Sequence, residues 1–342
     1  MKERGFKRLG RALLLTVVIL PGAALAEGEV NVYSSRHYGN DDVLFDGFTE
    51  KTGITVNRIE GKGPALLERL KSEGEASPAD VFVTVDAGMF WRGEEAGIFQ
   101  PIESAYLEER IPAHLRDPEG EWFGFSKRAR VIYVDPAKID NPPKRYEDLA
   151  DEEYKGQICI RSSSNIYNLS LMASIIAADG EEAAQKWADG VVANMARSPQ
   201  GGDTDQIKAV GAGECGLSVG NTYYMVRLLT SDDEALKSMA ERLTVVFPNQ
   251  EDRGTHVNIS GAGVVKGAEN RENAIKLLEY LASDEAQEHF ANGNNEYPVV
   301  EGVAANAAVI GLGSFKEDEL NVSTLGSLQP EAAKTMDRAG WQ

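Results

Sequence analysis

Apolar and polar positions along this chain follow a repeating order of short strand-like runs and longer helical patterns. Residues 29–34, 54–59 and 79–85 have strand-like patterns, and the amphipathic segments 41–51 and 64–72 between them have the period of helices. A β-α-β-α-β order predicts a parallel sheet with helices on both faces. The sequence therefore predicts an α/β fold.

The second half of the chain repeats this style. Strand-like runs at 157–160 and 216–219 alternate with helical patterns at 169–178, 181–195 and 205–210. Because the chain is longer than one hydrophobic core usually supports, we expect a second α/β lobe.

Two extended runs, 128–134 and 243–247, each end at a proline-containing turn, and we expect them to be the strands that cross between the lobes. The strand-like segment 255–264 and a long helix at 272–291 return to the first lobe. The lobes, each a mainly parallel sheet flanked by helices, then face each other across a hinge and form a cleft that closes on a solute. The predicted boundaries are 27–127 plus 253–303 for lobe 1, and 128–252 plus 304–342 for lobe 2.

The first 26 residues read as a secretory signal peptide. Five basic residues precede the apolar run 12–20, and an Ala-x-Ala pattern ends at Ala26. The run is far shorter than the roughly 20 apolar residues of a membrane-spanning helix. No cysteine follows Ala26 directly, which disfavours a lipid anchor. The mature chain is therefore predicted to be a soluble periplasmic protein without membrane insertion.

The formal net charge is −19, and removal of the basic leader makes the chain more acidic. Such a surface repels nucleic acid and anionic lipid. It also keeps a secreted protein soluble, so charge alone does not identify the ligand.

Cys159 and Cys215 are the two cysteines of the chain. Because an exported protein meets an oxidising compartment, we expect them to form a structural disulfide. Two buried free thiols remain the alternative, since spacing alone does not show geometry.

Tyrosines follow several predicted strand ends, where ligands of open α/β sheets bind. Since neighbouring residues of a strand face opposite sides, an adjacent tyrosine pair shares one site only if the strand breaks near Asn221. Taken singly, a tyrosine is more often a packing residue than a ligand. The positions are His37-Tyr38, Tyr167 and Tyr223-Tyr224.

These positions lie in segments that resemble the periplasmic ferric-ion-binding proteins of bacterial iron ABC importers. The segments are 33–38, 126–131, 161–167, 220–224 and 255–263. The resemblance implies that Tyr38, Tyr167, Tyr223 and Tyr224 bind the iron, with His37 as a fifth ligand whose use differs between members. It also implies that Arg128 and Arg227 lie near the metal, where they hold an anion such as carbonate or tune the site.

The resemblance further implies a monomer that delivers Fe³⁺ to an inner-membrane permease and its ATPase. Ferric iron is a hard ion that prefers anionic oxygen donors, and it must displace the phenol protons. Affinity should therefore fall in acid, and reduction to the softer Fe²⁺ offers a second release route. Whether the protein also serves Fe²⁺ stays open at this point.

Other functions compete with iron binding. The same two-lobed scaffold can bind an organic solute such as a polyamine or a carboxylate. Arg128 and Arg227 can instead be ordinary surface ion pairs. An enzyme is disfavoured, because the histidines at 37, 114, 256 and 289 lack metalloprotease spacing.

Overall fold

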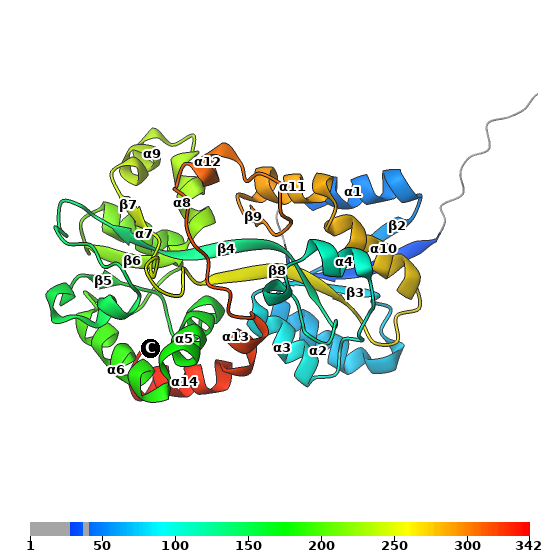
Figure 1. The fold of residues 1–342 in the computed structure, drawn as a ribbon, viewed down its shortest axis with the longest axis horizontal. Helices are drawn as coiled ribbons and strands as arrows, with labels where there is room; N and C mark the ends of the chain where they lie inside the picture. Colours follow the sequence, from blue (N-terminus) through cyan, green and yellow to red (C-terminus); the bar gives the residue numbers. More distant parts are fainter. Residues whose placement is uncertain (1–27, 37–40) are drawn as a thin grey trace, which may run out of the picture.

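The computed structural model describes residues 28–36 and 41–342, so the predicted signal peptide and the predicted ligands His37 and Tyr38 lie outside the described residues. Figure 1 shows two α/β lobes side by side, with strands β4 (Phe123–Val134) and β8 (Val257–Val264) running through the middle of the molecule. Among the described helices, none has the length and apolar character that crossing a membrane requires. The two-lobed α/β architecture expected from the sequence is confirmed.

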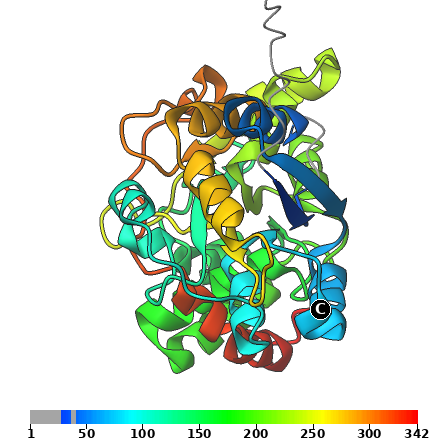
Figure 2. The same cartoon turned by 90° about the vertical axis from the view of Figure 1, so that its right-hand side faces the viewer.

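Lobe 1 is built around β1 (Glu29–Ser34), which pairs in parallel with β2 (Thr55–Glu60) and β3 (Val81–Val85). Strand β8 then runs antiparallel beside β3. The helices of this lobe cover the sheet, as Figure 2 shows from its outer end. They are α1 (Asp41–Thr52), α2 (Gly63–Glu73), α3 (Ala87–Glu95), α4 (Ala105–Arg110), α10 (Arg271–Leu281) and α11 (Asp284–Asn294).

Lobe 2 has a smaller sheet of β5 (Ile158–Cys159), β6 (Leu217–Asn221) and β7 (Thr244–Val246) beside the second half of β4. Its helices are α5 (Ile166–Asp179), α6 (Glu181–Asn194), α7 (Asp203–Gly211), α8 (Thr222–Leu229), α9 (Glu234–Glu241) and α14 (Gln329–Arg338). Helix α5 is almost entirely buried between its neighbours, which suits its nearly continuous apolar sequence.

The buried apolar residues form two large clusters. The first contains Phe48, Phe82 and Phe90 of lobe 1, and the second lies in lobe 2 around Ile132 and Trp187. The first cluster continues into lobe 2 through Met225 of α8, so apolar packing also connects the two lobes.

The hinge is crossed by β4, as the sequence predicts. This strand pairs with β8 through Ala129 and with β6 from Arg130 onward. The run 243–247, predicted as the other crossing strand, does not cross: it is β7, which pairs with the lobe 2 half of β4, and the chain returns through residues 247–256 into β8.

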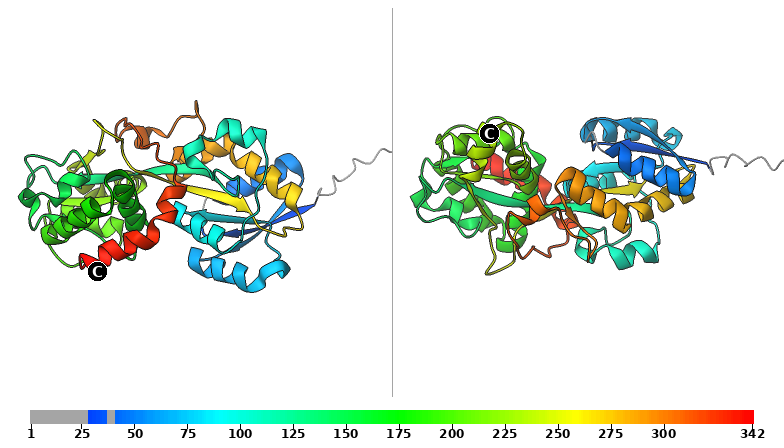
Figure 3. Two further views of the ribbon diagram at one scale, coloured as in Figure 1. Left: turned by 60° about the horizontal axis from the view of Figure 1, so that its bottom comes forward. Right: turned by 90° about the horizontal axis from the view of Figure 1, so that it is seen from above.

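A further connection follows the short strand β9 (Tyr297–Pro298), which pairs with β4 in lobe 1. The chain then passes through α12 (Ala307–Ile310) and α13 (Ser323–Ser327) before α14. Helix α13 packs against both α3 and α5, and the two views of Figure 3 show this orange-to-red segment between the lobes.

The expectation of mainly parallel sheets needs correction. The pairs β1–β2, β1–β3 and β5–β6 are parallel, but β4 and β8 are antiparallel to their neighbours. A strand that enters one lobe and a strand that returns from it must run in opposite directions, which explains the mixed sheet.

The long helix expected at 272–291 is wrong in one respect, because it is two helices, α10 and α11. Ser283 separates them, and its hydroxyl accepts a hydrogen bond from the Ala286 backbone N–H as an N-cap. Serine favours this position because its oxygen satisfies an N–H group that has no partner within the helix.

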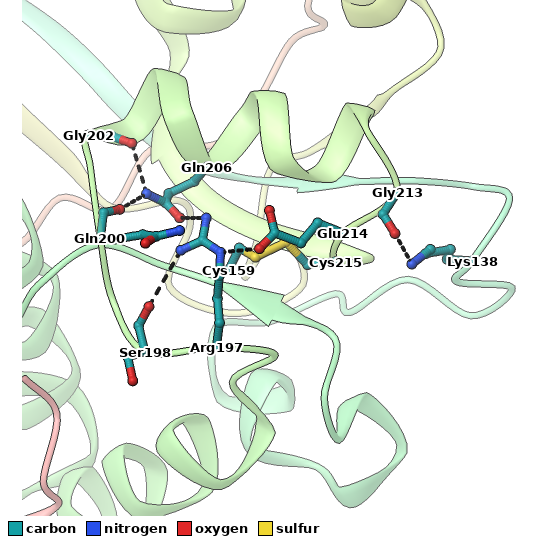
Figure 4. Close-up of a disulfide and its surroundings, with 10 residues drawn as sticks. All are labelled: Lys138, Cys159, Arg197, Ser198, Gln200, Gly202, Gln206, Gly213, Glu214 and Cys215. Carbon is teal, nitrogen blue, oxygen red and sulfur yellow. Dashed lines mark hydrogen bonds and ion pairs between the residues drawn. A yellow bond between two sulfur atoms is a disulfide. The ribbon is translucent and has the colours of Figure 1, made fainter.

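The Cys159–Cys215 disulfide is present and confirms the prediction. Figure 4 shows it between the strand that contains Cys159 and the end of the loop after α7. Both cysteines are fully buried. Cys159 is the last residue of β5, and Cys215 lies just before β6, so the bridge ties together two paired strands whose carboxyl ends lead toward the tyrosines.

Candidate functional site

The tyrosine pair lies at the point where β6 becomes α8. The strand ends at Asn221 and the helix begins at Thr222, so the predicted break is present. Consecutive side chains of a helix are about 100° apart rather than opposite, so Tyr223 and Tyr224 can share one side. Their ring centroids are 4.3 Å apart.

Tyr167 reaches the same place from another element. It occupies the first turn of α5, where the Asn165 side chain accepts a hydrogen bond from the Tyr167 backbone N–H at 3.1 Å. The hydroxyl of Tyr223 lies 3.5 Å from that of Tyr167. Three of the predicted ligands therefore meet, and all three belong to lobe 2.

Arg128 lies against this cluster from β4. It is only 2% exposed, and its guanidinium carbon is 5.6 Å from the centroid of the Tyr167 ring. Its Nη1 donates to the Ser260 hydroxyl at 3.2 Å, whereas its Nε and Nη2 have no hydrogen-bond partner among the described residues. A surface ion pair does not describe this residue.

Arg227 covers the other side of the tyrosine pair. Its guanidinium carbon is 5.0 Å from the Tyr223 ring centroid and 6.0 Å from that of Tyr224. The residue is exposed on α8, in contrast to Arg128. Arg128 and Arg227 thus place a buried and an exposed positive charge beside the phenols.

Arg130 is a functional residue that our sequence reasoning missed. Its guanidinium pairs with Asp203 at 3.1 Å and donates to the side-chain oxygens of Asn221 at 3.0 Å and Asn168 at 2.6 Å. Asn221 precedes the tyrosine pair and Asn168 follows Tyr167, so Arg130 supports both helix starts. The two-residue period of a strand places positions 128 and 130 on one face, and that signal was available in the sequence.

Arg161 was also missed, although it lies within one of the segments that carry the resemblance. Its guanidinium carbon is 5.8 Å from the Tyr167 ring centroid, and its Nη1 is 3.5 Å from Asp203. Tyr167 is therefore bordered by several guanidinium groups.

Burial raises the pKa of the Tyr167 phenol, and the positive charge of Arg128 opposes that rise. Burial also raises the pKa of Asp86, again against the charge of Arg128. The site therefore holds its phenol protonated when empty, while the nearby guanidinium favours the ionised form.

The groups at this cluster that suit a metal ion are phenol oxygens. In the part of the chain that the structure describes, no three His, Cys, Asp or Glu side chains are grouped so as to hold a metal ion. Phenolates are hard anionic oxygen donors, which suit a hard trivalent cation better than a soft one. The clustered aromatic rings also suit an organic cation, so geometry alone leaves both chemistries available.

The chain is similar to a known family of proteins. Residues 76–311 match the model of the bacterial extracellular solute-binding proteins. The chain belongs to this family. A solute-binding protein of this kind works with an ABC transporter, to which it brings its solute.

Known relatives of this solute-binding protein bind iron. It is 53% identical to iron uptake protein A1 of Synechocystis over 340 residues. The alignment covers 98% of this chain and 94% of the relative. Its fold matches a Trichodesmium protein (IdiA or FutA) in complex with iron and citrate ligands, with a TM-score of 0.90, 57% identity, and coverage of 92% and 100% of the two chains. It also matches a ferric binding protein from Campylobacter jejuni, with a TM-score of 0.84, 42% identity, and coverage of 92% and 100%.

These relatives are iron-binding transport proteins rather than enzymes, and the organic-solute alternative is not favoured. The expectation that this solute-binding protein resembles the ferric-ion-binding proteins is confirmed along almost the whole chain.

Proposed function

We propose that this solute-binding protein captures ferric iron in the periplasm and delivers it to the permease and ATPase of an ABC importer. The observation that carries the proposal is the meeting of Tyr167, Tyr223 and Tyr224 beside the buried Arg128. The likeness to iron uptake protein A1 over 98% of the chain supports the same cargo.

The proposed ligands are His37, Tyr38, Tyr167, Tyr223 and Tyr224. Residues 37 and 38 follow β1 in the sequence, and β1 ends at the same edge of the lobe 1 sheet as β3, because the two strands are parallel. Lobe 2 supplies the other three phenols. A cation bound by ligands from both lobes connects the lobes. This proposal therefore couples iron binding to hinge motion.

An anion is the proposed companion of the iron. Arg128 is buried and has two nitrogen atoms without a hydrogen-bond partner among the described residues, and such groups favour an anionic oxygen ligand. Carbonate or a carboxylate fits this chemistry. The Trichodesmium relative holds citrate together with its iron, which agrees with a carboxylate.

Ferric selectivity follows from charge in this proposal. Each phenol that binds must release its proton, and a trivalent ion displaces protons from buried phenols more strongly than a divalent one. Protonation or reduction to Fe²⁺ then weakens the complex and gives two release routes.

A spectroscopic titration tests the proposal. Phenolate bound to ferric iron absorbs visible light, so purified mature protein titrated with ferric citrate should turn orange to red. The double substitution Tyr223→Phe and Tyr224→Phe keeps both rings but removes both oxygens, and we expect it to abolish the colour and the tight binding.

The matched control is the double substitution Tyr106→Phe and Tyr280→Phe. Tyr106 is 41% exposed on α4, and the Tyr280 hydroxyl contacts Glu285 in lobe 1, so neither lies near the cluster. This variant should keep the colour of the wild type. Full iron affinity in the Tyr223/Tyr224 variant, or a colourless wild type that binds a polyamine instead, would reject the ferric site.

A further inference from the structure

Asp86 connects three elements at the border between the lobes. It ends β3 and caps α3, with an unusual backbone conformation of φ 75° and ψ 130°. Its side chain accepts hydrogen bonds from the Gly88 backbone N–H at 2.9 Å, from Asn258 Nδ2 on β8 at 2.9 Å, and from the Ser170 hydroxyl on α5 at 2.7 Å. A non-glycine residue at positive φ is held there only when its surroundings over-determine it, and such residues gather at functional sites.

The bond to Ser170 is the one that crosses between lobes. Ser170 lies one helical turn after Tyr167 on α5 and is fully buried. Because the donor belongs to lobe 2 and the acceptor to lobe 1, this short bond to a buried carboxyl fixes the start of α5 relative to β3 and β8.

A second polar contact runs parallel to the first. Arg92 Nη2 on α3 donates to the Gln329 side-chain oxygen at 3.1 Å, and Gln329 Nε2 lies 3.4 Å from the Ser170 hydroxyl. Gln329 is 3% exposed at the start of α14, which packs on α5. The two contacts therefore converge on one buried junction of α3, α5 and α14, seen near the centre of Figure 1.

Gly88 allows the Gln329 side chain to lie close against helix α3. A Cβ atom at position 88 would lie 1.7 Å from Gln329 Nε2. The residue is within α3 and its backbone does not have a positive φ, so alanine suits the helix itself, but the far end of the Gln329 side chain must move to admit it.

We propose that the Asp86–Ser170 hydrogen bond, supported by Arg92 and Gln329, is an inter-lobe latch that positions the Tyr167 helix against lobe 1 and slows the release of iron. The inference rests on the proposed function for its cargo. Asp86 and Ser170 are positioning residues here, because they hold α5 and contact none of the phenol groups in the described hydrogen bonds.

The first test removes the latch hydroxyl with Ser170→Ala. Iron-loaded protein is mixed with excess chelator, and the loss of visible absorbance gives the release rate. We expect release to accelerate about tenfold to a hundredfold, the range for a buried polar group left without its hydrogen bond. The matched control is Ser174→Ala on the same helix, whose buried hydroxyl donates to the Leu171 carbonyl inside α5 and should leave the rate nearly unchanged.

The second test uses Gly88→Ala to displace the Gln329 side chain from its contacts with Arg92 and Ser170, and it does not depend on the Ser170 variant folding. Its matched control is Gly47→Ala on α1, where a new Cβ would lie 2.5 Å from the Tyr280 hydroxyl within lobe 1. Gly88→Ala should speed iron release in the same way as Ser170→Ala, while Gly47→Ala should not. Small-angle scattering of the iron-free proteins should show larger dimensions for the two latch variants only.

The outcomes separate the two proposals. A wild-type protein that never develops the ferric absorbance refutes the proposed function. A wild type that binds iron, together with Ser170→Ala and Gly88→Ala variants that release it at the rate of their controls, refutes the latch and leaves the function standing.

Discussion

Phenol ionisation at Tyr167 is governed by two opposing influences. Burial disfavours the phenolate, and the guanidinium of Arg128 favours it. Iron binding needs the phenolate, so any change that raises the pKa of Tyr167 makes proton displacement harder and moves iron binding to higher pH. The affinity of the wild type should therefore fall as the solution is acidified.

The substitution Arg128→Met tests this balance. Loss of the positive charge raises the pKa of the phenol, so the pH at which half the protein is iron-loaded should rise by about one pH unit. The measurement is the ferric absorbance as a function of pH at fixed ferric citrate. Arg69→Met is the matched control, because Arg69 lies 4.8 Å from the ring centroid of Tyr33, away from the cluster. Equal midpoints in the two variants would contradict the assigned role of Arg128.

At the scale of single residues, the sequence predicted the tyrosines of the site but not the residues that hold them in place. Tyr167, Tyr223 and Tyr224 were predicted from strand ends and resemblance, and the structure brings them together. The strand period placed Arg130 on the face of Arg128, but its role was not predicted, because its partners Asn168 and Asp203 lie far away in the sequence. The roles of the predicted ligands stay a proposal.

The residues at which strands end and helices begin determine where the tyrosines of the site lie. Strand β6 stops at Asn221, and the change to a helix turns an adjacent pair of residues toward one side. The Cys159–Cys215 bridge joins the end of β5 to the segment just before β6, with which β5 pairs, and closes a loop with a sequence separation of 56. Strand register and helix start are thus fixed together in lobe 2.

The double substitution Cys159→Ala and Cys215→Ala tests the bridge. In the chain-entropy account, loss of a loop of this size lowers the free energy of unfolding by about 3–4 kcal/mol. Urea unfolding, followed by far-ultraviolet circular dichroism, measures this value. Wild-type protein unfolded with reductant present should show a comparable decrease. An unchanged midpoint in both experiments would mean that the bridge adds no stability.

Helix boundaries were harder to predict than helices. The apolar period continues from α10 into α11, so the pattern suggested one helix at 272–291. Ser283 followed by two acidic residues is a capping signal, and a new helix begins there although the apolar period continues. Periodicity alone could not reveal the break, whereas the capping residues could have done so.

Across the whole molecule, residues 329–342 close lobe 2. Trp341 is 3% exposed, its ring centroid lies 6.0 Å from that of Trp187, and its indole N–H donates to the Arg161 carbonyl at 3.1 Å. Arg161 begins the loop that leads to Tyr167. The segment therefore stabilises a lobe whose strands come from the middle of the sequence.

Two substitutions separate packing from hydrogen bonding at this position. Trp341→Ala should lower the free energy of unfolding by roughly 3–5 kcal/mol, since it leaves a cavity. Trp341→Phe keeps most of the ring and should lose only about 1 kcal/mol from the missing N–H donor. Urea unfolding curves with equal slopes measure both values. Similar losses for the two variants would show that the hydrogen bond, rather than the ring, holds the segment.

The two-lobed architecture was predictable because alternating strand and helix patterns repeat in both halves. The antiparallel neighbours and the passage of α13 between α3 and α5 were not, because they depend on contacts between segments far apart in the sequence. The lobe boundaries at 127, 252 and 303 stay a prediction.

Strand β4 changes partners between Ala129 and Arg130, so Arg128 belongs to one lobe and Arg130 to the other. If the halves rotate, this backbone lies close to the axis and moves least. The Arg130 guanidinium then moves with the tyrosines, because it bonds to Asn168 and Asn221, whereas the Arg128 guanidinium stays with lobe 1, where it bonds to Ser260. A redesign that seeks to change the cargo while keeping the motion should therefore alter the tyrosines and retain both arginines.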